Sequence, residues 1–167
     1  MFNDFDIHLE ALKIGEHKFK FLLDKTFFES KEYSLIETGN LTVELKFVKK
    51  ERLSELFFSY DGTVNLHCDT CGGKFDYPID FSDETILKYG EENYIDDGVW
   101  VIDNSTKELD IAQYLYESLC LEVPKKVSHE DSLDEECDKE VLEKLADLSQ
   151  ANNNKIDPRW DALSKLK

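Results

Sequence analysis

Segments in which apolar and polar residues alternate constrain the fold of this chain most, and they are concentrated between residues 41 and 81. In the clearest of them, residues 41–48, the apolar side chains fall on one face: Leu41, Val43, Leu45 and Phe47. A period of two is typical of a β-strand with one buried face. The chain is therefore expected to bury one side of a β-sheet.

Two further strands are predicted on either side of Asp61-Gly62. Residues 56–60 and 63–68 are strand-like and flank this dipeptide. Asp-Gly is favoured in type I′ turns, because both central residues of such a turn need a positive φ. We therefore predict a hairpin that turns at Asp61-Gly62. Residues 75–81 form another predicted strand, and Pro78 indicates an edge position because it has no N–H to donate.

The remaining elements indicate an α+β fold. Strand character also appears in residues 5–24, around Gly15, and in residues 99–102. A helix is predicted from Asp24, as its N-cap, to about Leu35. Because strands come first and helices later, we expect a mainly antiparallel β-sheet or partly open barrel in the N-terminal two-thirds, with helices toward the C-terminus.

The C-terminal part is predicted to contain three helices. The first follows Asp110, a plausible N-cap, and ends before Pro124; its predicted face comprises Ile111, Tyr114, Leu115, Ser118 and Leu119. The second spans residues 138–148. We therefore expect one α+β domain over residues 1–148, a polar linker at 149–156 and a last helix at 157–167, with Asp157 as N-cap and Pro158 in its first turn.

The charge balance favours basic partners. Lys and Arg number 20 and Asp and Glu number 37, which gives a net charge of −17 at pH 7. Such a surface repels a phosphate backbone at long range and attracts basic proteins such as ribosomal proteins. The alternative is that the acidic surface only keeps the protein soluble. With no apolar window long enough to span a membrane and no basic N-terminal region of a signal peptide, we expect a cytoplasmic protein.

The most chemically specific segment is Cys68-Asp69-Thr70-Cys71-Gly72-Gly73. Two cysteines at this spacing, followed by glycines, can form a tight turn that directs both sulfurs at one point. Zinc needs four tetrahedral ligands, so this motif supplies half of a site. The candidates for the other two ligands are Cys120, His129 and Cys137. His129 and Cys137 lie in the loop after Pro124, whereas Cys120 falls on the predicted helix and is equally well explained as a buried thiol.

Two other interpretations of the cysteines remain open. They are compatible with free structural thiols, as expected in a reducing compartment. They are also compatible with thiol redox chemistry, which usually places a Cys-x-x-Cys pair at a helix N-terminus. Here the pair follows one predicted strand and precedes another, which favours a structural zinc site.

No motif in the sequence indicates an enzyme. A phosphate-binding glycine loop, Gly-x-Ser-x-Gly and His-Glu-x-x-His are all absent. The histidines His8 and His17 fall in strand-like segments, and alternation places His67 on the face opposite Cys68. The pair Phe57-Phe58 is assigned to the core. We therefore predict no catalytic residues.

Several segments in order resemble the bacterial YceD (DUF177) family. They are Leu12 to Phe19, Phe27-Phe28, Leu41 to Leu45, Asp61-Gly62-Thr63-Val64 running into Cys68-Asp69-Thr70-Cys71, Tyr116 to Pro124 with His129, and Asp157-Pro158-Arg159-Trp160-Asp161-Ala162-Leu163. Two features depart from the family pattern: Thr70 stands where members often have Arg, and Cys120 has no counterpart.

The resemblance implies a role in the accumulation of large-subunit ribosomal RNA, without catalysis. Our leading hypothesis is an assembly factor whose acidic surface holds a basic large-subunit ribosomal protein or an immature subunit. We expect the metal ligands to be Cys68, Cys71, His129 and Cys137, holding a structural Zn²⁺. The last helix is a candidate docking element through Arg159, Trp160 and Leu163. The alternative is that this helix packs back on the domain.

Two alternative functions come from different classes. The chain could bind RNA directly, and the basic segments Lys49-Lys50-Glu51-Arg52 and Lys125-Lys126 are the candidates for that contact. It could also be a thiol redox protein that uses Cys68 and Cys71. Loss of RNA binding on lysine-to-glutamate substitution would support the first, and a depressed thiol pKa the second.

Overall fold

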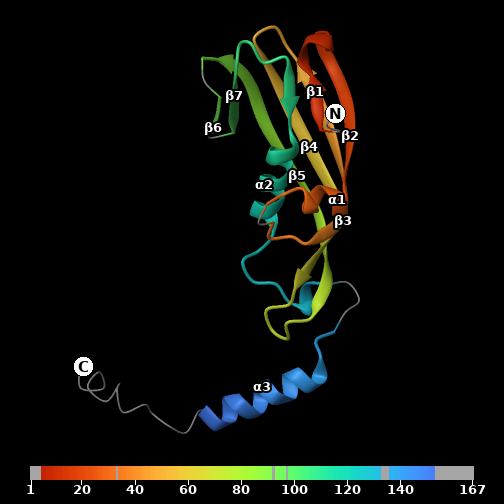
Figure 1. Ribbon diagram of the computed structural model, residues 1–167, viewed down its shortest axis with the longest axis vertical. Helices are drawn as coiled ribbons and strands as arrows, with labels where there is room; N and C mark the ends of the chain where they lie inside the picture. The colour runs from red at the N-terminus through yellow and green to blue at the C-terminus, as the bar shows by residue number, and fades with distance from the viewer. Residues whose placement is uncertain (1–4, 33, 92, 97, 133–135, 153–167) are drawn as a thin grey trace, which may run out of the picture.

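The computed structural model describes residues 5–32, 34–91, 93–96, 98–132 and 136–152 (Figure 1). Its main element is a six-stranded sheet with the order β2-β3-β4-β5-β7-β6. The strands are β2 (Gly15–Leu23), β3 (Thr38–Lys49), β4 (Leu53–His67), β5 (Lys74–Gly90), β6 (Tyr94–Asp96) and β7 (Val99–Asp103). All neighbours are antiparallel except β5 and β7. The predicted α+β class is confirmed, and the sheet is open.

A small second sheet closes one end of the molecule. β1 (Asp6–His8) pairs with β8 (Glu108–Asp110), and the 3-10 turn η1 (Leu9–Ala11) follows β1. Lys49, at the end of β3, donates from Nζ to the carbonyls of Leu9 and Leu12 at 2.8 and 2.9 Å. This lysine therefore joins the small sheet to the large one.

The alternation predicted for residues 41–48 is confirmed. Leu41, Val43, Leu45 and Phe47 on β3 are at most 1% exposed and face the core. The same period on β4 buries Phe58 and leaves Phe57 only half-buried on the opposite face of the sheet. The assignment of Phe57 to the core was therefore wrong, because adjacent residues of a strand point to opposite faces.

The hairpin predicted at Asp61-Gly62 was also wrong. β4 continues through this dipeptide, and the chain turns instead between β3 and β4 and again between β4 and β5. Gly62 does have a positive φ of 144°, but glycine is needed here because there is no room for a Cβ. A Cβ at this position would lie 2.2 Å from the carbonyl oxygen of Asn40 and 2.8 Å from the Cα of Leu41 on β3. The glycine allows two strands to approach closely, which a local turn motif cannot reveal.

The edge position predicted for Pro78 is confirmed. β5 pairs with β4 along its length, but β7 joins β5 only from Ile86 to Gly90. Pro78, opposite Thr63, therefore lies where β5 has a single strand partner. The missing N–H of proline costs no ladder hydrogen bond at such an open edge.

The first helix is shorter than predicted. α1 spans Lys25–Glu29, and the N–H of Phe27 donates to Asp24 Oδ1 at 3.1 Å, so the predicted N-cap is confirmed. The helix ends at Glu29 rather than near Leu35. The hydroxyl of Ser30 donates to the carbonyl of Phe27 at 2.6 Å and satisfies an oxygen that a longer helix would have used.

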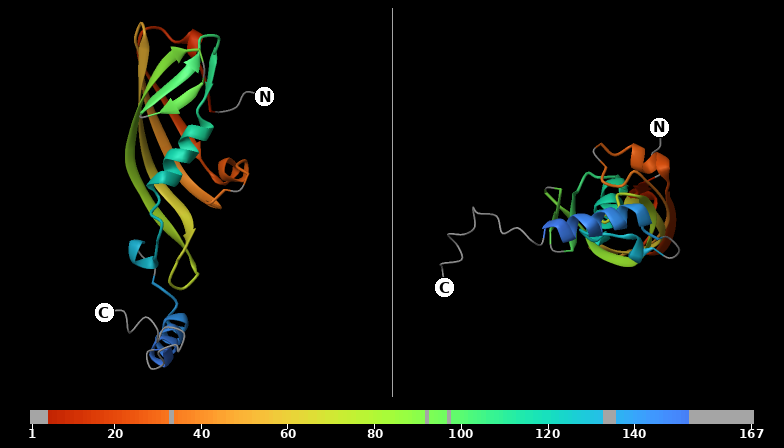
Figure 2. Two further views of the ribbon diagram at one scale, coloured as in Figure 1. Left: turned by 90° about the vertical axis from the view of Figure 1, so that its left-hand side faces the viewer. Right: turned by 90° about the horizontal axis from the view of Figure 1, so that it is seen from below.

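α2 (Ala112–Glu122) lies across one face of the large sheet (Figure 2). Its buried residues are Ala112, Leu115 and Leu119, and Tyr114 stacks on Trp100 of β7 with ring centroids 5.2 Å apart. The helix begins one residue later than a cap at Asp110 implies, although the Asp110 carboxylate accepts from the N–H of Ala112 at 2.8 Å. The core therefore lies between α2 and the sheet.

The C-terminal part leaves the sheet. The 3-10 turn η2 (His129–Asp131) is followed by α3 (Lys139–Asn152), which points away from the sheet in Figure 1. α3 corresponds to the helix predicted at 138–148 and extends four residues further, into the segment expected to be a linker. The rest of that linker and the helix expected at 157–167 lie outside the described residues.

Candidate metal centre

The turn between β4 and β5 directs two sulfurs toward one point. The N–H of Cys68 donates to the carbonyl of Gly73, and the N–H of Gly72 donates to the carbonyl of Cys68, both at 2.8 Å. Gly72 has a φ of 74°, in the left-handed region that only glycine adopts at no cost. The strand alternation places Cys68 in the interior and His67 outside, as predicted. The turn therefore holds Cys68 and Cys71 on the same side.

A second segment, from after α2, is hydrogen-bonded to this turn. The N–H of Asp69 donates to the carbonyl of Val127 at 2.9 Å, and the N–H of Val127 donates back to Asp69 Oδ2 at 2.7 Å. Val127 is buried. Because His129 follows two residues later, this pair of bonds sets its position opposite the two cysteines.

The position of His129 is fixed further by its neighbours. The N–H of Ser128 donates to Asp131 Oδ2 at 2.8 Å, which closes the short turn η2. The ring of Phe75 packs against the imidazole with centroids 5.0 Å apart. A Cβ at Gly73 would lie 3.3 Å from His129 Cε1 and 3.4 Å from Cys71 Sγ, so a glycine is favoured there. His129 is consequently only 7% exposed.

Four donor atoms converge at this end of the sheet. Nδ1 of His129 lies 3.4 Å from Cys71 Sγ and 3.5 Å from Cys137 Sγ, and the sulfurs of Cys68 and Cys137 are 3.7 Å apart. All four donor atoms lie within 4.8 Å of one another. A tetrahedral zinc ion with ordinary bond lengths has edges of about 3.8 Å between sulfurs and about 3.5 Å between sulfur and nitrogen. The cluster could therefore hold a metal ion, and its geometry fits Zn²⁺.

The surroundings of Cys68 and of Cys137 shift their thiol pKa values in opposite directions. Burial acts to raise the pKa of Cys68, but the backbone N–H groups of Cys71, Thr70 and His129, with the His129 side chain, outweigh it and lower that pKa to about 5. Burial, together with the neighbouring sulfurs of Cys68 and Cys71, raises the pKa of Cys137 to about 11. Three thiolates this close together would repel one another, and a divalent cation is the usual means of holding them together.

The structure brings together the four ligands expected from the sequence. It leaves the alternative candidate, Cys120, outside the cluster. Cys120 lies on α2, where it packs against the core and burial raises its pKa. Cys68 and Cys71 lie at a strand end and in a turn rather than at a helix N-terminus, so the geometry typical of thiol redox pairs is missing from them. The candidate docking residues Arg159, Trp160 and Leu163 lie outside the described residues.

The basic segments expected to contact RNA differ in availability. Lys49 is engaged with the carbonyls of η1, and Lys50 forms an ion pair with Glu55. Lys125 and Lys126 are exposed between α2 and η2. Part of the segment at 49–52 therefore stabilises the fold. A short run of basic residues in the sequence does not show whether its lysines bind within the protein or are exposed to a partner.

Sequence reasoning missed the residues that position the ligands. Asp69, Gly73 and Phe75 act through contacts with residues more than fifty positions away, which carry no local signature. The available signals were the glycines that follow Cys71, which indicated a tight turn, and Asp69 inside the Cys-x-x-Cys turn, where a carboxylate often accepts backbone N–H groups.

Fold and site together define an α+β protein with an open, mainly antiparallel sheet and a Cys₃His cluster at one end. The chain belongs to the family described as Large ribosomal RNA subunit accumulation protein YceD, whose model matches residues 56–167. The matched range contains all four cluster residues, whereas the resemblances noted at residues 12–45 lie outside it. The family's description associates it with the accumulation of large-subunit ribosomal RNA.

The other comparisons add no relative. No curated protein matches the chain, and no solved structure matches it. Among the described residues, no helix is both long enough and apolar enough to cross a membrane.

Proposed function

We propose that this protein is a non-catalytic factor in the biogenesis of the large ribosomal subunit and that it holds a basic ribosomal protein or an immature subunit. The observation that carries the proposal is the family match over residues 56–167. The net charge of −17 supports a basic partner, because complementary charge speeds encounter and disfavours partners of like charge.

In this proposal Zn²⁺ has a structural role. Cys68 and Cys71 come from the β4–β5 turn, His129 from η2 and Cys137 from the segment before α3. The ion would supply four bonds that join the β4–β5 turn to η2 and to the segment before α3. It would thereby help to fix the direction in which α3 leaves the sheet. The docking role of Arg159, Trp160 and Leu163 is a further part of the proposal.

The proposed function is tested by sedimentation of the tagged protein from growing cells at about 0.1 M and about 1 M salt, where the screening length falls from about 10 to about 3 Å. We expect the protein to sediment with large-subunit precursor particles at low salt and to be released at high salt. A smaller fraction of a Trp160→Ala variant is expected to sediment with these particles. A protein that stays at the top of the gradient at both salt concentrations would contradict the proposed function.

Asp69 offers a test of the metal centre that leaves the four ligands in place. Asp69→Ala removes the acceptor for the Val127 N–H, so His129 is held less firmly. We expect zinc affinity to fall about 10- to 100-fold, the usual effect of losing a group that orients a ligand. Competition with a chromophoric chelator measures the affinity. Asp80→Ala, on an exposed site of β5, is the matched control, and equal affinities for the two variants would contradict the assignment.

A further inference from the structure

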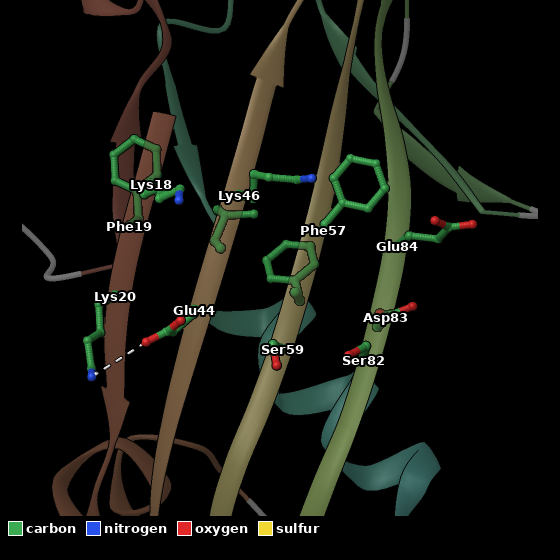
Figure 3. A pocket seen from close by; sticks show the side chains of 12 residues that line it. Lys18, Phe19, Lys20, Glu44, Lys46, Phe57, Ser59, Ser82, Asp83 and Glu84 are labelled. Atoms are coloured by element: carbon green, nitrogen blue, oxygen red, sulfur yellow. Dashed lines mark ion pairs between the residues drawn. The ribbon is translucent and has the colours of Figure 1, made fainter. Parts of the chain in front are cut away.

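A row of side chains crosses the outer face of the sheet, opposite α2. The strand register places Lys18 beside Lys46, Lys46 beside Phe57 and Phe57 beside Glu84. The next row consists of Lys20, Glu44, Ser59 and Ser82. These two rows line a hollow of about 810 Å³, which Figure 3 shows in front of β2 to β5. Sequence reasoning had missed this surface, because its residues come from four different strands.

The centre of the hollow is an aromatic ring beside cations. Phe57 is half-buried, and the Lys46 ammonium lies over its ring, 4.5 Å from the ring centroid. A lysine over a phenyl ring gains modest energy at an exposed site. The arrangement leaves a flat apolar surface directly adjacent to positive charge.

The two lysines in the first row contribute little to stability. Lys18 and Lys46 are directly opposite each other on adjacent strands, an arrangement that is unfavourable for like charges. Lys18 has Glu16 at 3.7 Å and Lys20 has Glu44 at 3.7 Å, but all four side chains are at least half exposed, and such pairs contribute little. An anion bound beside these lysines would gain charge-assisted hydrogen bonds from them.

We propose that this outer-face row binds single-stranded RNA. A base would stack on Phe57, and phosphates would contact Lys18, Lys46 and Lys20. Glu84 and Glu44 border the hollow, and their carboxylates would accept hydrogen bonds from base amino groups. This inference rests on the proposed function, since a precursor of the large subunit would present such RNA.

The site is separate from the metal centre. Phe57 lies on β4 and Cys68 directly follows that strand, eleven residues further along the chain, which corresponds to about 35 Å of extended backbone. The hollow also lies on the face of the sheet that α2 does not cover. Substitutions in the hollow are therefore expected to leave zinc binding unchanged.

The binding test uses fluorescein-labelled oligoadenylate of about ten nucleotides, a length that one small binding surface can engage. Fluorescence anisotropy is measured with the zinc-loaded full chain over a range of salt concentrations. Three phosphate contacts predict a slope of log affinity against log salt of about −2. Phe57→Ala is expected to weaken binding about 5- to 100-fold, and Lys46→Ala to reduce the slope by about 0.7.

Lys144→Ala, an exposed lysine on α3, is the matched control and should bind like the unmodified chain. Circular dichroism and zinc content establish that each variant is folded. No binding by the unmodified chain, or equal binding by Phe57→Ala and Lys144→Ala, would overturn the inference.

Sedimentation separates this inference from the proposed function. If the unmodified chain and Phe57→Ala both sediment with precursor particles and neither binds the oligonucleotide, the RNA surface is wrong and the proposed function stands. If the unmodified chain binds the oligonucleotide but never sediments with particles, the proposed function fails and the RNA surface stands.

Discussion

A Cys68→Ser variant is expected to lose its zinc and to unfold at a temperature lower by about 6–12 °C. Serine is a poor zinc ligand, so the site would keep only three of its four donors. Structural zinc contributes about 10–16 kcal/mol in small zinc domains, which have no other core. Here the sheet has its own core, and we expect a smaller loss of about 3 kcal/mol, concentrated at the end that carries Cys71, His129 and Cys137. Metal analysis of the purified protein and thermal unfolding measure the two effects.

Cys120→Ser is the matched control, because Cys120 is a half-buried cysteine outside the cluster. It should retain about one zinc ion per chain, as a single four-ligand site requires. A chelator added to the unmodified protein should reproduce the effect of Cys68→Ser. If both cysteine variants keep the same metal content as the unmodified chain, the Cys₃His assignment is wrong.

The metal cluster shows which part of a site can be predicted from a sequence. The Cys-x-x-Cys spacing indicates half of a tetrahedral site by itself, because both ligands lie in one turn. The position of the loop after Pro124 made His129 and Cys137 candidates. The preference for them over Cys120 came from the family resemblance. In the structure Cys120 lies on α2, packs against the core and is not among the four clustered donors. That placement follows from packing and not from any local motif.

The strands, like the metal cluster, could be predicted only in part. Alternation predicted correctly which face of β3 is buried, because the period of a strand is independent of its length. It did not predict that β4 and β5 are fifteen and seventeen residues long. Turn residues suggested an interruption at Asp61-Gly62, but pairing with β3 on one side and β5 on the other keeps the strand continuous. Tertiary pairing overrides a local turn preference when both neighbours are in place.

Gly62→Ala is expected to reduce the free energy of unfolding by about 3 kcal/mol. The new Cβ would lie 2.2 Å from the Asn40 carbonyl oxygen, so β3 and β4 would have to separate, and the φ of 144° would be strained in addition. Gly62→Asn should be equally damaging. In a type I′ turn, by contrast, asparagine is readily accepted, so this pair of variants distinguishes a strand from a turn at residues 61–62. Urea unfolding, followed by circular dichroism, measures the loss.

Gly15→Ala isolates the effect of close approach. Gly15 has a similar φ of 134°, but a Cβ there meets no atom within 4 Å. Its replacement should therefore cost only the backbone strain, about 1–2 kcal/mol. A loss at Gly62 no larger than that at Gly15 would mean that β3 and β4 separate at little cost. Tolerance of Gly62→Asn alone would support the predicted hairpin turn at Asp61-Gly62. A clearly larger loss for both Gly62 variants would establish that this glycine is required by the strand next to it.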